Sequence, residues 1–219
     1  LDTSFGENGA LAVDGSVYDM KVAAGKIIVG GSFGSIGGNA INDVARISFS
    51  GALDESFYSG DGTNATVRGL FIQPDGKIIL GNEYIDSYDG YYYGGSIVRL
   101  NSDATVDLGF EADSFGYGSS FEFVDGKILV SMPWWTRIAR LNGDGSTDWS
   151  FDPILFSGYE NNLNVWRLNN GQLLANGYFG EDDDYGLNKF AAHGTRIPSF
   201  HPALSEQGLI TSMLIVGNK

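Results

Sequence analysis

The 219-residue sequence contains no cysteine, only 5 prolines and 2 histidines, and 13 basic residues against 27 acidic ones. The absence of cysteine excludes disulfide bonds and thiol catalysis, but it does not indicate a cellular compartment. No run of 18 apolar residues occurs, so the sequence predicts no transmembrane segment. The formal charge of −14 repels phosphate backbones, so nucleic acid is not an expected partner.

Glycine and aromatic residues are abundant, with 32 Gly, 14 Phe, 11 Tyr and 4 Trp. Glycine is needed where tight turns require a positive φ, and aromatic residues favour strands. The composition therefore predicts short strands joined by tight turns. Because residue 1 is Leu and no signal-peptide pattern precedes it, we expect a processed product or an excerpt of a longer chain.

One motif, a glycine-bearing turn followed by an apolar run, occurs four times. A Gly-Lys or Gly-Gln pair starts at 25, 76, 126 and 171, and an aromatic residue stands seven positions after the Lys or Gln each time. An Asp-Gly pair, as at 75–76 and 125–126, suits a type I′ hairpin turn. The following apolar run is typical of a strand buried on both faces. The four copies are AGKIIVGGSF (24–33), DGKIILGNEY (75–84), DGKILVSMPW (125–134) and NGQLLANGYF (170–179).

A second motif follows each copy of the first. It begins near a basic residue that lies eleven positions before a Phe, and three copies carry an Asp three positions before that Phe. Eight of the 13 basic residues lie at positions of these two motifs, which indicates a structural role for most Lys and Arg. The Asp residues are expected to cap turns and the Arg residues to brace a carboxylate or carbonyl. The copies are ARISFSGALDESF (45–57), VRLNSDATVDLGF (98–110), ARLNGDGSTDWSF (139–151) and NKFAAHGTRIPSF (188–200).

These motifs divide the chain into four repeats of about fifty residues, with the LDTSF tail at the start and a broken fifth copy at the end. Short antiparallel strands in a repeat without helices predict an all-β protein, a β-propeller with four-stranded blades. A parallel β-helix is the other option, but its coils are shorter. We expect one propeller segment over 1–219, with repeats near 1–52, 53–105, 106–146 and 147–195 and a partial one at 196–219.

The combination of LDxSF, DGKI(I/L)(V/L)GG and (A/V)RLNxDG resembles the delta-60 repeat family of bacterial β-propellers, and the resemblance covers essentially the whole chain. It implies a propeller in a large secreted, cell-surface or phage protein. The sequence departs from the pattern at Ser131-Met132, Gln172 and Ile197. The Kelch Tyr/Trp pairing is absent, and Asp148-Trp149 is not the WD dipeptide of WD40 propellers.

Binding residues are expected where the copies differ, in the segments between the second and third strands. The segment 85–95 carries Tyr88, Tyr91, Tyr92 and Tyr93, which could contact a sugar or protein or pack among themselves. Trp134 stands at the repeated aromatic position and is expected in the core. Trp135 has no counterpart and is the surface candidate.

No cofactor is predicted, and no catalytic residue is assigned. Calcium is the one metal considered, because Asp182, Asp183 and Asp184 offer carboxylate oxygens. They lack the alternation of an EF-hand loop, so a solvated acidic loop is the competing interpretation.

The sequence therefore predicts a non-catalytic propeller on a cell surface or virion, for adhesion, glycan or protein binding, or scaffolding. Its partners would be a surface protein or glycan, or neighbouring chains. The alternative is a propeller-type glycosidase or lyase that uses acidic residues near the central channel. Since propellers usually have more than four complete blades, we also expect a longer ring or an assembly that completes it.

Overall fold

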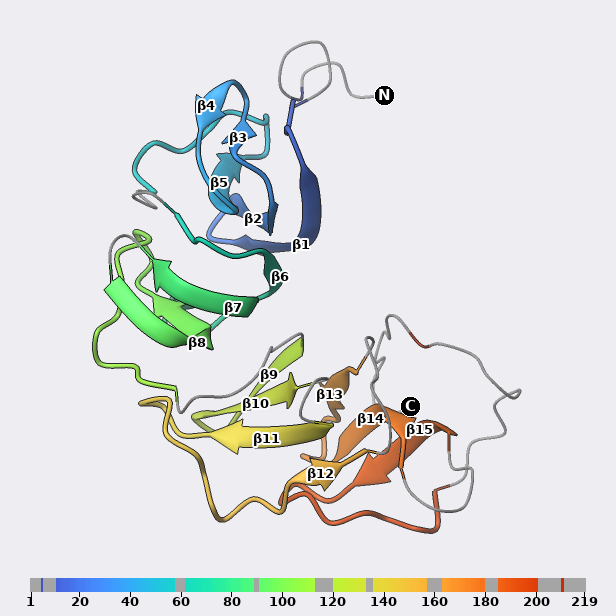
Figure 1. Ribbon diagram of the computed structural model, residues 1–219. Coiled ribbons are helices and arrows are strands. Elements are labelled where there is room, and N and C mark those ends of the chain that lie inside the picture. The colour runs from blue at the N-terminus through green and yellow to red at the C-terminus, as the bar shows by residue number, and fades with distance from the viewer. Residues whose placement is uncertain are drawn as a thin grey trace. The chain divides into compact units, whose positions relative to one another are not determined.

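The computed structural model describes residue 5, residues 11–57, 62–88, 91–112, 120–132, 136–156, 163–179 and 185–200, and residue 210. The chain divides into two compact units, Leu1–Phe110 and Glu111–Lys219. Each unit holds two antiparallel sheets of three or four strands, which we call blades 1 to 4 in chain order, and the first unit also holds a two-stranded sheet (Figure 1). No helix in the described ranges is long and apolar enough to cross a membrane.

The first unit contains blades 1 and 2. Blade 1 has the order β1-β2-β5, with strands Ser16–Ala23, Lys26–Ser32 and Val44–Ser48. Between β2 and β5 the chain forms a small separate hairpin of β3 (Ser35–Ile36) and β4 (Asn39–Ala40). Blade 2 has the order β6-β7-β8, with strands Val67–Ile72, Ile78–Tyr88 and Tyr91–Leu100.

The second unit contains blades 3 and 4. Blade 3 has the order β12-β11-β10-β9, from β9 (Ser120–Val124), β10 (Lys127–Met132), β11 (Arg137–Leu141) and the short β12 (Ile154–Leu155). Blade 4 has the order β13-β14-β15, from Val165–Arg167, Leu173–Tyr178 and Tyr185–Phe190. The apolar run of each repeat is a strand, as predicted, and becomes β2, β7, β10 or β14.

The middle strand of each blade is buried on both faces, as its apolar run predicts. In β7, Ile78, Ile79 and Leu80 are all inaccessible to solvent although consecutive side chains point to opposite faces. The corresponding residues of β10 are equally buried. Each blade is therefore covered on both sides over its central strand.

The hairpins between first and second strands use two kinds of turn. Asp125 and Gly126 have φ of 51° and 78° between the paired residues Val124 and Lys127, which is the predicted two-residue type I′ geometry. The same prediction for Asp75-Gly76 is wrong. There Gly76 N donates to the Gln73 carbonyl at 2.9 Å, and only Gly76 has a positive φ, so the loop has three residues and starts with Pro74.

The LDxSF tail forms an anchored turn that meets its own blade through a single bridge. Leu53 bridges to Ile47 of β5, and the Phe57 amide then donates to the Asp54 carbonyl at 3.0 Å. The other three tails repeat both contacts. In the described residues, three blades therefore have three strands and a bridged tail where four strands were predicted, and blade 3 gains a fourth strand from β12 rather than from its tail.

Blade 2 packs directly on blade 1. A Cβ added to Gly30 of β2 would lie 2.7 Å from Cγ1 of Val67, so glycine is needed there for close approach. Ile28 and Val44 of blade 1 share one core cluster with Val67 and Leu70 of blade 2. This cluster joins the two blades of the first unit, and a second cluster around Val29 and Ile36 lies in blade 1.

Candidate functional site

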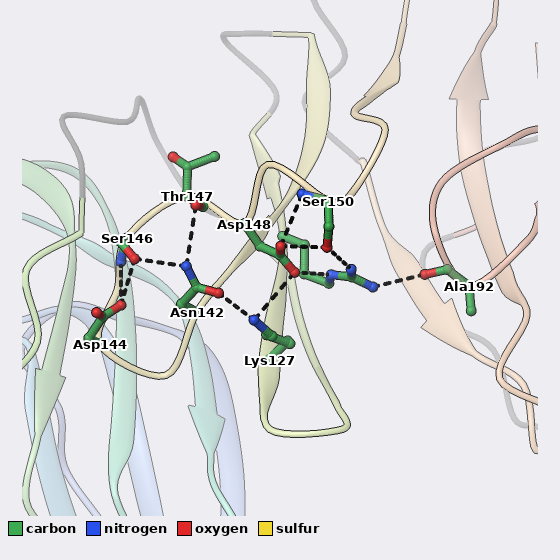
Figure 2. Close-up of polar contacts among 9 residues, drawn as sticks. Lys127, Asn142, Asp144, Ser146, Thr147, Asp148, Ser150 and Ala192 are labelled. Atoms are coloured by element: carbon green, nitrogen blue, oxygen red, sulfur yellow. Dashed lines mark hydrogen bonds and ion pairs between the residues drawn. The ribbon is translucent and has the colours of Figure 1, made fainter.

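The repeated basic residue and the repeated tail aspartate form an ion pair inside each of blades 1 to 3. In blade 3, Arg140 Nε donates to Asp148 Oδ2 at 2.8 Å. Lys127 Nζ lies 3.6 Å from the same oxygen, and the Ser150 amide and hydroxyl donate to Oδ1 at 3.1 and 2.7 Å (Figure 2). The arginine also lies over the Phe151 ring, 5.0 Å from its centroid. The two motifs are thus one contact network, which we call the brace.

Blades 1 and 2 repeat the brace with the same residue positions. Arg46 Nε lies 3.0 Å from Asp54 Oδ2, and Arg99 Nε lies 2.7 Å from Asp107 Oδ2. The motif lysines add ion pairs of 3.3 and 2.7 Å to the same oxygens. Both arginines stack over the tail phenylalanine of their own repeat. The expectation that these Asp and Arg residues are structural is confirmed.

The brace also reaches the following blade. Arg46 Nη1 donates to the Ser102 carbonyl of blade 2 at 2.6 Å, and Arg140 Nη1 donates to the Ala192 carbonyl of blade 4 at 3.1 Å (Figure 2). Both carbonyls belong to the turn after the third strand. Each arginine therefore holds its own tail and the next repeat at once.

Blade 4 lacks the lysine, the arginine and the aspartate of the brace. Gln172 replaces the lysine, Lys189 the arginine and Ile197 the aspartate, although Ile197 N still donates to the Lys189 carbonyl at 2.8 Å. Lys189 keeps the contact with the tail ring, at 5.5 Å from the Phe200 centroid. The carboxylate and one of the two cations are both absent, so Lys189 is the one charge that blade 4 keeps at the brace positions.

The surroundings of the brace aspartates lower their pKa values. Burial raises the pKa of Asp148, but the hydrogen bonds from Ser150 and the Arg140 charge outweigh it and lower the pKa to about 2. The Ser56 hydroxyl, followed by Lys26 and Arg46, holds the pKa of Asp54 well below its usual range. Such carboxylates stay ionised and saturated with donors, which makes them unsuitable as general acids.

The segments between the second and third strands, where the copies differ, are called variable segments below. In blades 1 and 2 they leave their sheets at the same edge. Ile36 of the β3–β4 hairpin bridges to Val13, and Tyr88 at the tip of the β7–β8 hairpin bridges to Thr63. Val13 and Thr63 each lie four residues before the matching positions Val17 and Val67 of the first strands. Both segments thus fold back in the same way and bury one side chain each in their blade's cluster.

Asp43 joins the first variable segment to blade 2. Its Oδ1 accepts from the Phe33 amide at 3.0 Å, and its Oδ2 accepts from the Thr63 hydroxyl at 3.1 Å. Its φ is 62°, and burial raises its pKa. Among the carboxyls with a shifted pKa in the described part of the chain, only Asp43 shows a rise. A residue with a positive φ and a carboxyl of raised pKa is typical of functional sites. In Asp43, however, both carboxylate oxygens accept hydrogen bonds that link the first variable segment to blade 2.

The structure places one predicted binding residue in the core. Tyr88 is 1% exposed, and its hydroxyl donates to the Ala104 carbonyl at 3.3 Å, so of the two alternatives for this tyrosine the structure supports packing rather than surface contact. Tyr91, Tyr92 and Tyr93 lie in β8, whose side chains there are outside the described part. Trp134, Trp135, Asp182, Asp183 and Asp184 also lie outside the described residues. For all of these the binding and metal roles stay predictions.

No group of three or more His, Cys, Asp or Glu side chains that could hold a metal occurs among the described residues. The Asn142–Asp144 segment loosely resembles a calcium loop. It is a turn whose polar side chains form hydrogen bonds with one another and with the turn's own backbone. Asp144 Oδ1 accepts from the Ser146 amide and hydroxyl at 3.0 and 2.7 Å, and Asn142 Nδ2 donates to the Ser146 hydroxyl at 2.8 Å (Figure 2).

Sequence reasoning did not single out Trp149, the most exposed aromatic residue in the described part of the chain. Trp149 is 87% exposed in the tail of blade 3. It stands at the variable position of LDxSF, where the other copies have Thr3, Glu55, Leu108 and Pro198. That variation within a constant motif was the available signal, because a position that tolerates Glu, Leu, Trp and Pro faces solvent.

A protein-family profile supports this architecture. The family described as a domain of unknown function (DUF5122) beta-propeller matches residues 25–57 and 73–110, which hold both motifs of repeats 1 and 2. No curated protein matches the chain.

Solved structures share the fold at low sequence identity. The WD40 beta propeller domain of Doa1 is 16% identical with a TM-score of 0.58, over 82% of this chain and 52% of that one. Virginiamycin B lyase from Staphylococcus aureus is 14% identical with a TM-score of 0.55, over 87% and 60%. The computationally designed Ika4 protein is 9% identical with a TM-score of 0.54, over 82% and 93%. The chain thus spans about half to three-fifths of the two natural chains, and it has a β-propeller fold.

Proposed function

We propose that the chain is a non-catalytic β-propeller module of the delta-60 type that binds a protein or glycan at a bacterial cell surface or on a virion. The observation that carries the proposal is the division of labour within each repeat. The charged residues that recur in blades 1 to 3 are paired with one another in the braces. The segments between second and third strands, in contrast, differ in length and sequence from repeat to repeat.

The shared edge of blades 1 and 2 supports this assignment. Both variable segments return to matching positions before the first strand, so their exposed residues belong to the same side of the scaffold. Variable segments on one side of a rigid scaffold are where repeat proteins usually bind ligands. The sequence adds Tyr91, Tyr92 and Tyr93 in the second segment and Trp135 in the third, whose rings and polar groups suit sugar or protein contacts.

The test is a glycan array and a hydrolysis screen on the same panel, together with binding to intact bacterial and host cells. We expect binding without turnover, which a Tyr91→Ser/Tyr92→Ser/Tyr93→Ser variant weakens. Trp149→Ser serves as the control, because Trp149 lies on a tail rather than in a variable segment.

Two results would overturn the proposal. One is turnover of a glycan that a single Asp→Asn change abolishes, as expected for the alternative of a propeller-type glycosidase or lyase. The other is the absence of binding to every glycan and cell type. The likeness to a lyase concerns the fold only and favours neither outcome.

A further inference from the structure

The carboxylate of Asp43, at the junction of blades 1 and 2, has no basic partner among the described residues. Burial raises its pKa, and the groups that lower it are the Phe33 amide and the Thr63 hydroxyl. The aspartate of each brace, in contrast, lies beside two basic side chains. A partly buried carboxylate is costly to keep ionised unless a positive charge or several donors compensate it. The junction therefore favours the addition of a positive charge.

The oxygen atoms around Asp43 also outnumber the donors that reach them. The Thr63 hydroxyl lies 3.1 Å from Asp43 Oδ2 and within hydrogen-bond distance of the Ala65 carbonyl, but it has one proton to donate. Asn82 is 0% exposed, and its Nδ2 donates to the same carbonyl at 3.1 Å. Its Oδ1 is buried and accepts no hydrogen bond from the described residues. The group lacks a positive partner rather than another acceptor.

The Asn82 amide can turn its oxygen toward the others. A half-turn of the amide exchanges its oxygen and nitrogen and leaves the space that it fills almost unchanged. Oδ1 would then lie where Nδ2 lies now, 3.1 Å from the Ala65 carbonyl oxygen. Two oxygens at that distance repel each other unless a cation lies between them. The amide is therefore suited to serve as a ligand once a cation is bound.

We propose that this junction binds a hard cation such as Ca²⁺ through four oxygens, those of the Asp43 carboxylate, the Thr63 hydroxyl, the Ala65 carbonyl and the Asn82 amide. Carboxylate, carbonyl and amide oxygens are the ligands that Ca²⁺ takes in proteins, and water completes its coordination. Only one ligand is a carboxylate, so the binding is expected to be weak, with a dissociation constant on the order of 1 mM.

The backbone holds these groups together on both sides of the junction. The Phe33 amide donates to Asp43 Oδ1 at 3.0 Å, which leaves Oδ2 facing Thr63. Gly62 has a φ of 72°, and a Cβ added there would collide with the Asn42 carbonyl, so glycine lets the two segments approach. A cation would fix the first variable segment to blade 2. This would stiffen the edge that we propose for ligand binding, but the inference does not depend on which ligand binds there.

The first test is the thermal unfolding midpoint after dialysis against EDTA, with CaCl₂, NaCl or choline chloride added at equal ionic strength. We expect about 10 mM CaCl₂ to raise the midpoint by about 3–6 °C over choline chloride. A rise with NaCl alone would assign Na⁺ as the bound cation. The absence of a rise in both salts would overturn the proposal, because a proton or an ordered water would then serve the junction.

A charge-removing variant assigns the effect to this junction. Asp43→Asn should abolish the rise, and it should fold, because asparagine tolerates the φ of 62° at this position. Asp103→Asn is the matched control. Asp103 also accepts from a threonine hydroxyl, that of Thr105 at 2.6 Å, but it lies in an exposed turn of blade 2 and should keep the full rise. A rise that Asp43→Asn retains would mean that the cation binds elsewhere and would refute the site.

A charge-adding variant predicts effects of opposite sign with and without the cation. Asn82→Asp places a second carboxylate in the site, so calorimetric titration should show Ca²⁺ binding at least about tenfold tighter. In EDTA the same variant should unfold at a lower temperature than the unmodified chain, because the added carboxylate is buried without a partner. An affinity for Ca²⁺ that is unchanged or lower in Asn82→Asp would contradict the proposal.

Discussion

The guanidinium of Arg140 and the carbonyl of Ala192 lie 52 positions apart in the chain and are joined by a 3.1 Å hydrogen bond. The same arginine pairs with Asp148 of its own tail. One side chain thus fixes the tail of a repeat and the turn of the next repeat. Arg46 makes the equivalent pair of contacts in the first unit, so the arrangement is a property of the repeat.

Replacing Arg140 should destabilise the second unit more than replacing its counterpart in blade 4. Arg140→Gln removes an ion pair and the link to Ala192, and we expect a loss of about 1–3 kcal/mol in the free energy of unfolding. Lys189→Gln removes only a contact with a ring, worth about 0.5–1 kcal/mol. Urea unfolding of both variants measures the difference. Equal losses would contradict the structural role assigned to the brace.

Acid should lower the free energy of unfolding, because it protonates the brace aspartates. The pKa of Asp148 is lowered to about 2 in the folded chain, against about 3.9 for a free Asp. A depressed carboxyl pKa stabilises the folded state above the unfolded value, and this contribution is lost as pH falls from about 4 to about 2. Unfolding free energies measured across this range should fall less steeply for Asp148→Asn. An unchanged slope would show that Asp148 does not supply this dependence.

The turn after the third strand tolerates a side chain in blade 2 but not in blade 3. Gly145 has a φ of 94°, and an added Cβ would lie 2.7 Å from the Glu111 carbonyl carbon, so Gly145→Ala should cost about 2 kcal/mol or more. Ala104 already occupies the matching position with a φ of 71°. Ala104→Gly relieves about 1 kcal/mol of strain and loses about 0.8 kcal/mol of methyl burial, so it should be nearly neutral. Thermal unfolding of the pair checks the contrast, and a harmless Gly145→Ala would refute it.

Tyr88 should behave as a core residue. Tyr88→Ala should destabilise the first unit by about 3–5 kcal/mol, because a buried ring is lost. Tyr88→Phe removes only the 3.3 Å hydrogen bond to Ala104 and should cost about 1 kcal/mol. Chemical denaturation measures both values. A stable Tyr88→Ala protein that loses ligand binding would restore Tyr88 as a surface contact.

The sequence predicted the blades well because their determinants are local and recur. A glycine turn, an apolar run and a following basic residue recur at nearly constant spacing, and each repeat confirms the others. The type of turn at Asp75-Gly76 was wrong because Pro74 favours a three-residue loop, which the Asp-Gly pair alone does not reveal. Trp149 was not predicted as a surface residue because it occupies the variable position of LDxSF, whereas the prediction rested on the positions that recur.

The position of Tyr88 could not be read from its neighbours in sequence. A tyrosine-rich segment is compatible with a free loop or with a hairpin that folds back on its blade. The choice depends on Thr63, which is 25 positions away and bridges to Tyr88, and on the space beside Ala104. Local patterns carry no information about such tertiary contacts, so binding residues in variable segments are harder to assign than strands.

The central claim is that the two repeated motifs act as one energetic unit, and a double-mutant cycle on Arg140 and Asp148 tests it most directly. Unfolding free energies are measured for Arg140→Gln, Asp148→Asn, the double variant and the unmodified chain. Since both side chains meet at 2.8 Å and are largely buried, we predict a coupling free energy of about 1–3 kcal/mol. A coupling below about 0.3 kcal/mol would mean that the two positions act independently, and it would contradict the account.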